Sequence, residues 1–227
     1  MNPTVAELAK MIDHSLLHPT MTTQVLDEGL AVALEWDVAS VCIKPYALPR
    51  AVAALAGSSV APSTVIGFPH GGETTADKLA QIREALASGA TELDGVVNIG
   101  QVLSGEWGYV RDEVGQLAAA CHDGGALFKL IFENCYLDDA QKTALCELAS
   151  AVGVDFVKTS TGYGTGGATL DDLRLMRAHT PPSVRVKAAG GVRTLDALLD
   201  VRAAGASRCG ATRTVEMLSE AVERFGR

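Results

Sequence analysis

The chain has 227 residues, 48% of them hydrophobic, with a formal net charge of −8 and a pI near 5.1. This length allows one sizeable core, and α/β barrels reach it as a single domain, so we expect one domain over residues 1–227. The acidic balance argues against nucleic-acid binding, which needs a basic surface. Without a long apolar run or a signal-like N-terminus, we expect no membrane association and a cytoplasmic location.

Short apolar runs alternate with helical stretches along the chain, after a short helix expected at 3–10. Eight such units, whose predicted strands begin 23 to 34 positions apart, predict an α/β fold, the closed parallel (β/α)8 or TIM barrel, in which a unit typically takes about 31 residues. A doubly wound open sheet would share this alternation, but the count of eight and the ionisable residues near strand ends favour the barrel. Strands are predicted to begin near Ile12, Val38, Thr64, Glu92, Ala126, Asp155, Val184 and Ser207. Helices are predicted over 22–35, 49–56, 74–88, 106–123, 138–151, 169–178, 194–204 and 213–225.

Two lysines end predicted strands in unusually apolar surroundings. Lys158 follows Phe156 and Val157 and precedes small residues, and Lys187 stands in a similar run before two glycines. Lysine is rarely buried unless it is paired, and loss of water or a neighbouring cation lowers its pKa and leaves more of the neutral amine that attacks carbonyls. Because barrel enzymes collect their chemistry at the carboxyl ends of several strands, the sequence predicts an amine-based active site at that rim.

Acidic residues on other predicted strands are candidate partners for these lysines. Strand alternation places Glu92 and Asp94 on one face, so one of them is expected to point into the barrel. A buried carboxylate is costly unless it is paired, and a neighbouring lysine would make it a proton shuttle. A structural ion pair between strands explains the pattern equally well. Asp13 is a further strand-end candidate, and Lys129 with Glu133 is expected to form another internal pair in a supporting role.

Metal and disulfide motifs are weak in this sequence. His14 and His18 have the four-residue spacing of a helical metal pair, but Pro19 follows directly and the segment is predicted as strand and loop, so no metal site is expected. The five cysteines form no Cys-x-x-Cys pair and are expected to be small buried hydrophobes. Cys42 would lie close to the site if its strand reaches the active rim.

Three glycine-rich loops follow late strands. Residues 162–167 match the dinucleotide pattern G-x-G-x-x-G, but no acidic residue stands about twenty positions on, so no dinucleotide cofactor is expected. The loops 190–194 and 210–214 each open a helix after the last two predicted strands, where barrel phosphate sites form from backbone N–H groups and the positive end of a helix. The predicted phosphate-binding residues are Gly162, Gly190, Gly191, Arg193, Gly210 and Thr212.

Five segments resemble motifs of the deoxyribose-phosphate aldolase family, in the same order along the chain: 12–17, 68–71, 92–94, 157–162 and 187–194. The runs that begin at Lys158 and Lys187 are the most specific. The resemblance implies a barrel that reversibly cleaves 2-deoxy-D-ribose 5-phosphate to acetaldehyde and D-glyceraldehyde 3-phosphate without a metal or other cofactor, and a homodimer. It implies Lys158 as the Schiff-base amine, Lys187 as the neighbouring cation and Asp94 as the proton donor and acceptor. Four residues are expected to support these three: Asp13, Cys42, Lys129 and Thr159.

Two positions depart from the family pattern. Arg213 stands where the family usually has a small residue, and would either strengthen phosphate binding or change which aldehyde fits. Gly95 replaces a bulky apolar residue and is expected to loosen the packing beside Asp94. Two alternatives therefore stay open: a Schiff-base aldolase for another phosphorylated sugar, and a barrel that has lost catalysis and serves in binding.

Overall fold

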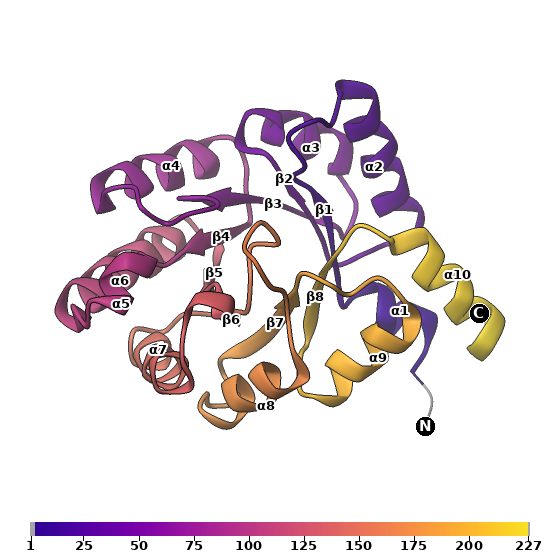
Figure 1. Cartoon of the computed structure of the whole chain (residues 1–227). Helices are drawn as coiled ribbons and strands as arrows, with labels where there is room; N and C mark the ends of the chain where they lie inside the picture. Colours follow the sequence, from indigo (N-terminus) through magenta and orange to yellow (C-terminus); the bar gives the residue numbers. More distant parts are fainter. Residues whose placement is uncertain (1–2, 227) are drawn as a thin grey trace.

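The computed structural model describes residues 3–226 and confirms the predicted (β/α)8 barrel, in which β1 to β8 are parallel and follow one another around a closed ring. Helices surround the ring on its outside (Figure 1). The strands are β1 (Ile12–Leu16), β2 (Ser40–Ile43), β3 (Ala61–Ile66), β4 (Glu92–Val96), β5 (Leu127–Ile131), β6 (Phe156–Lys158), β7 (Arg185–Ala189) and β8 (Arg208–Ala211). The main helices are α2 (Thr23–Glu35), α3 (Leu48–Leu55), α4 (Thr75–Ala87), α6 (Trp107–Asp123), α7 (Asp139–Ala151), α8 (Leu170–Ala178), α9 (Leu195–Ala203) and α10 (Thr214–Phe225).

Most helices begin one residue after the predicted position because the predicted first residue is the N-cap. The side chains of Thr22, Thr74, Asp138, Thr169 and Thr194 each accept a hydrogen bond from the backbone N–H three positions on. Such caps satisfy N–H groups that the first helical turn leaves without partners. The hydroxyl and carboxylate residues that indicated these boundaries in the sequence are therefore the caps that determine where the helices begin.

Shorter elements complete the barrel. The expected N-terminal helix is α1 (Val5–Ala9), and Lys10 at its end contacts Asp37 and the carbonyl of Val38, just before β2 begins. This places α1 at the amino ends of the strands. The sequence did not predict α5 (Ile99–Leu103) or the 3-10 turns η1 (Pro45–Ala47) and η2 (Asn134–Tyr136). Within residues 3–226, no helix has both the length and the apolar character needed to span a bilayer.

The two faces of the strands carry different chemistry. Outward residues such as Leu93, Leu130 and Val186 are fully buried beneath the helices and belong to one large apolar core. Charged side chains instead fill much of the barrel interior, where ion pairs cross between strands that are not neighbours, as from Lys129 on β5 to Asp13 on β1. A charge away from water is costly unless it is paired. The barrel therefore depends on matched charges inside and on apolar packing outside.

Candidate active site

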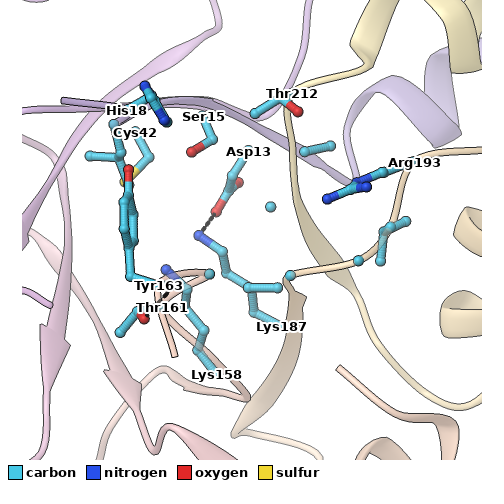
Figure 2. A pocket seen from close by; sticks show the side chains of 18 of the residues that line it. Asp13, Ser15, His18, Cys42, Lys158, Thr161, Tyr163, Lys187, Arg193 and Thr212 are labelled. Atoms are coloured by element: carbon cyan, nitrogen blue, oxygen red, sulfur yellow. Dashed lines mark hydrogen bonds and ion pairs between the residues drawn. The ribbon is translucent and has the colours of Figure 1, made fainter. Parts of the chain in front are cut away.

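A cavity of about 300 Å³ opens at the carboxyl ends of the strands. Lys158 and Lys187 lie at its floor (Figure 2). Figure 2 also shows two opposite walls, one with Tyr163 and Cys42 and the other with Arg193. The strand ends that converge here are those of β1, β2, β6, β7 and β8, as predicted for an active rim.

Lys158 and Lys187 meet at a single carboxylate. They are register partners on β6 and β7, and the Nζ atom of each lies 2.7 Å from Oδ2 of Asp94 on β4. Asp94 is fully buried below the cavity floor, and both lysines are nearly so. The structure thus brings together the three residues predicted to carry the chemistry, with the carboxylate placed to exchange protons with either amine.

The surroundings move the pKa values of the two lysines in opposite directions. Burial lowers the pKa of Lys158, and Lys187 lowers it further against the opposing effect of Asp94. Burial acts in the same direction on Lys187, but Asp13 and Asp94 outweigh it and raise the pKa of Lys187. One amine is therefore the better nucleophile and its neighbour the more stable cation.

Further ion pairs surround Lys187 and tie it to the barrel interior. Asp13 contacts Lys187, Arg208 and, at 3.1 Å, Lys129. Lys129 also lies 2.6 Å from Glu92, which accepts a hydrogen bond of 2.8 Å from Arg208. Burial would raise the pKa of Asp13, but the three cations around it hold that pKa well below the usual carboxyl range. The predicted supporting residues Asp13 and Lys129 therefore belong to one network.

Charge balance inside the barrel favours an uncharged Lys158. Asp94 joins the network through Lys129, 3.0 Å from its Oδ1 atom, and the nearby cations outweigh burial and hold the pKa of Asp94 low. Three carboxylates are then balanced by three cations other than Lys158, and a fourth buried cation would be unmatched. The carboxylates are Asp13, Glu92 and Asp94, and the balancing cations are Lys129, Lys187 and Arg208.

The predicted pairing of Lys129 with Glu133 is wrong. Glu133 lies beyond the end of β5 in a left-handed backbone conformation, with φ of +58°, which turns its side chain towards the loop after β6. Its buried carboxylate accepts hydrogen bonds from the hydroxyl of Thr161 and, at 3.1 Å, from the Thr161 N–H. Glu133 therefore holds the loop that follows Lys158 in place, and it does not pair with the charge of Lys129.

The other two predicted supporting residues lie in different places. Cys42 is buried, lines the cavity, and has a pKa raised by burial, so its thiol is a poor nucleophile. Thr159 lies outside the cavity lining, and its hydroxyl donates to the carbonyl of Ala189 at 3.3 Å and accepts from the Ala189 N–H at 3.1 Å, which joins β6 to β7. All five cysteines are free, and Cys135 is exposed, contrary to the expectation of burial.

The six residues predicted to bind phosphate line the same cavity. Helices α9 and α10 begin directly behind two of these loops, so their N–H groups and positive ends face this side. The loop 162–167 also packs backbone to backbone against the loop 190–194, since a Cβ atom on Gly190 would lie 2.9 Å from the Cα atom of Gly167. The cavity wall here is a close glycine surface that an anion can approach.

The structure places the two departures from the family pattern in different surroundings. Arg213 is not among the residues that line the cavity, and it pairs with Glu216 at 2.7 Å, both side chains being more than half exposed. A Cβ atom on Gly95 would lie 2.7 Å from the ring of Phe128. The aromatic ring fills the space that the missing side chain leaves, and the expected looser packing beside Asp94 is absent.

The histidines are dispersed. Burial lowers the pKa of His14 to about 4, and its Nδ1 atom is hydrogen-bonded to Thr214 at 2.8 Å, whereas His18 is exposed at the cavity mouth. In the part of the chain that the structure describes, no three His, Cys, Asp or Glu side chains are grouped as metal ligands.

Arg208 and Tyr163, which shape the site, were not predicted from the sequence. Alternation along β8, as applied to Glu92, would have placed Arg208 inside the barrel. Tyr163, which forms part of the cavity wall, had no comparable signal beyond its position between two glycines.

Known proteins resemble this chain in both sequence and fold. A deoxyribose-phosphate aldolase of Rhodopirellula baltica is 60% identical, over 97% of this chain and 91% of its own length. The solved structure of a tetrameric deoxyribose phosphate aldolase from Aeropyrum pernix has a TM-score of 0.89 at 27% identity and covers 98% of this chain and 93% of that one. The solved structure of "QR15, an Aldolase" has a TM-score of 0.90 at 31% identity, and the match covers 96% of each chain. The profile of the DeoC/LacD family of aldolases matches residues 8–214, and the chain belongs to that family.

Proposed function

We propose that this aldolase reversibly cleaves 2-deoxy-D-ribose 5-phosphate into acetaldehyde and D-glyceraldehyde 3-phosphate through an imine on Lys158. The names of its relatives support the substrate. One observation supports the mechanism above all: the amines of Lys158 and Lys187 both contact the same oxygen of Asp94. In this arrangement the pKa of Lys158 is lowered and that of Lys187 is raised.

In the cleavage direction, the neutral Nζ of Lys158 attacks C1 of the open-chain sugar and gives a carbinolamine. Loss of water leaves a protonated imine, which accepts the electron pair of the C2–C3 bond as the C3 hydroxyl loses its proton and the three-carbon aldehyde departs. The resulting enamine is protonated at C2 and hydrolysed to acetaldehyde. Asp94 and Lys187 move the protons in these steps, because Asp94 lies within hydrogen-bond reach of both the reacting nitrogen and the Lys187 amine.

The glycine loops that line the cavity on the side of Arg193 are proposed to hold the phosphate of the three-carbon product. Backbone N–H groups and the helix ends of α9 and α10 supply donors, and Arg193 supplies the positive charge at this wall. A net charge of −8 does not oppose this binding, since the donors act locally. With the phosphate at this wall and C1 at Lys158, the substrate spans the cavity floor.

Borohydride trapping tests the imine. Incubation with acetaldehyde and borohydride should add two carbons to Lys158, located by peptide mapping, and Lys158→Ala should lose both adduct and turnover. Active protein without this adduct would refute the amine mechanism. For the substrate, turnover of the phosphorylated sugar should far exceed that of 2-deoxyribose. Equal efficiency would contradict phosphate binding, and a faster reaction with another phosphorylated sugar would support the alternative aldolase.

We further propose that residues 1–227 act as one domain, that the enzyme is cytoplasmic, and that it is a homodimer. One relative of known structure is tetrameric, so a tetramer is the alternative to be tested. Light scattering on the purified chain distinguishes the dimer, with about twice the 23.6 kDa chain mass, from a tetramer.

A further inference from the structure

A second cavity, about 570 Å³ in volume, lies beside the candidate active site. We call it the annex. Most of its lining is apolar, with Lys44, Glu73 and Gln81 as its polar members. Leu17 and Tyr163 line both cavities and so form the wall between them. The apolar members of the lining are Leu17, Pro19, Pro45, Val65, Phe68, Pro69 and Tyr163.

Tyr163 is the part of this wall that reaches across the barrel mouth. Its loop begins after β6, yet its ring meets Phe68 beyond the end of β3, edge to face, with 5.4 Å between the ring centroids. The loop after β6 arches over the barrel in Figure 1. Within residues 3–226 the Tyr163 hydroxyl has no hydrogen-bond partner, and glycines flank the residue on both sides. The ring is therefore held by packing at its face and edge alone.

The position of Tyr163 relative to Lys158 decides which part of a substrate it meets. In Figure 2, Tyr163 and Cys42 stand on one side of the two lysines, and Arg193 and Thr212 stand on the other. If the phosphate occupies the side of Arg193, the aldehyde carbons bound to Lys158 face Tyr163. A substituent on C2 of the donor aldehyde then points at the ring, and the annex lies behind it.

We propose that Tyr163 sets the size of the donor aldehyde, and that the annex is a binding site for the alkyl chain of a longer straight-chain aldehyde once the ring is removed. The inference rests on the proposed function. In the native enzyme the ring limits the donor to two carbons. Without it, each methylene that enters the apolar annex should favour binding about fourfold, so butanal, with two more methylenes than acetaldehyde, should gain about fifteenfold.

A competition trap measures this preference at Lys158 itself. Equimolar acetaldehyde and butanal are mixed with enzyme and borohydride. Either aldehyde condenses with the amine and releases water, and hydride from borohydride reduces the imine to a stable secondary amine. Mass analysis of the Lys158 peptide gives the ratio of four-carbon to two-carbon adducts. In Tyr163→Ala this ratio should rise about fifteenfold over wild type, whereas Tyr163→Phe, which keeps the ring, should retain the wild-type preference.

Two further variants separate the annex from a general widening of the site. Pro19→Trp, at an exposed position in the annex lining, should cancel the gain when combined with Tyr163→Ala. Val192→Ala, which enlarges the reaction cavity elsewhere, should leave the ratio at the wild-type value. If the ratio of four-carbon to two-carbon adducts in Tyr163→Ala equals that of wild type, the proposal is overturned. A second copy of the chain covering the annex would give this same result, and the proposal would be overturned in that case too. Failure of the proposed function is distinguishable, because the two-carbon adduct would then be missing from wild type.

Discussion

Lys158 and Lys187 share one carboxylate oxygen, yet only Lys187 also contacts Asp13. Both lysines are buried at the ends of neighbouring strands, so burial alone would lower both pKa values. The additional carboxylate reverses the shift for Lys187 and leaves Lys158 as the amine that loses its proton more readily. The difference between nucleophile and cation is thus made by a residue on β1, on the far side of β8 from both lysines.

Replacing Lys187 with leucine should lower kcat/KM by about 10²-fold or more, since proton transfer and field effects are each typically worth that much. Because Lys187 lowers the pKa of Lys158, its loss should raise that pKa and move the acid limb of the kcat/KM profile to higher pH. Lys142→Leu, which removes a largely buried lysine between α7 and α8, is the matched control and should leave the limb in place. A normal rate and profile for Lys187→Leu would remove the residue from the mechanism.

The low pKa values of Asp13 and Asp94 predict acid sensitivity of the fold. A carboxylate whose folded pKa is depressed stabilises the native state above its unfolded pKa of about 3.9, and this contribution is lost as the pH falls towards the folded pKa. The free energy of unfolding should therefore decrease below about pH 4. Asp13→Asn should be less stable at pH 7, by about 3–5 kcal/mol because a buried pair is broken, and its acid slope should be shallower. Urea unfolding at pH 7 and pH 3 measures both; an unchanged slope would contradict the ion-pair account.

Periodicity in the sequence was sufficient to predict the barrel and the residues at its rim. The spacing of the apolar runs and the capping hydroxyls located the elements, and alternation along β4 correctly placed Glu92 and Asp94 together. These features are local, so the sequence carries them directly. The short helix α5 was missed, whereas α1, which is equally short, was predicted; five residues span little more than one helical turn, so periodicity does not decide such elements.

Pairings across the barrel could not be predicted in the same way. Lys129 and Glu133 are close in the chain, and proximity suggested a pair, but the left-handed conformation at Glu133 turns its carboxylate out of the barrel. The same limit applies to Tyr163, whose contact with Phe68 depends on a loop that crosses the mouth. Which side chains meet over such distances is decided by loop conformation, which periodicity does not contain.

Glu133 should act as a positioning residue for the loop after β6. Its carboxylate holds Thr161, whose hydroxyl in turn accepts a hydrogen bond of 3.0 Å from the N–H of Tyr163. Glu133→Ala should raise KM for the phosphorylated sugar about tenfold, since each lost hydrogen bond to a charged group is worth about 1.5–3 kcal/mol and part of that cost falls on loop order. Trapping of acetaldehyde on Lys158 should fall much less than sugar cleavage. Thr161→Val removes the hydroxyl that contacts Glu133, and Thr161→Ser, which keeps it, is the matched control. Equal losses in acetaldehyde trapping and in sugar cleavage would indicate a general structural defect instead.

The ion pair of Lys78 and Glu113 offers a test of how charge is tolerated outside the barrel interior. Both side chains are fully buried between α4 and α6, 2.9 Å apart, and Lys78 also donates to the carbonyl of Val96 at the end of β4. Removing one partner leaves the other charge buried and alone, so Lys78→Met or Glu113→Leu should each cost about 3–5 kcal/mol of the free energy of unfolding.

The double variant Lys78→Met/Glu113→Leu should recover most of that loss, because no unmatched charge remains and the two apolar side chains can pack together. The hydroxyls of Thr75 and Tyr109, which each lie 3.2 Å from Glu113, are partly exposed and can turn to water. Urea unfolding of the three variants gives the coupling energy, and the exposed pair of Arg174 and Asp171 serves as the control, whose single variants should change stability far less. Losses in the single variants that simply add in the double variant would contradict the argument, because additivity would mean that the two charges do not depend on each other.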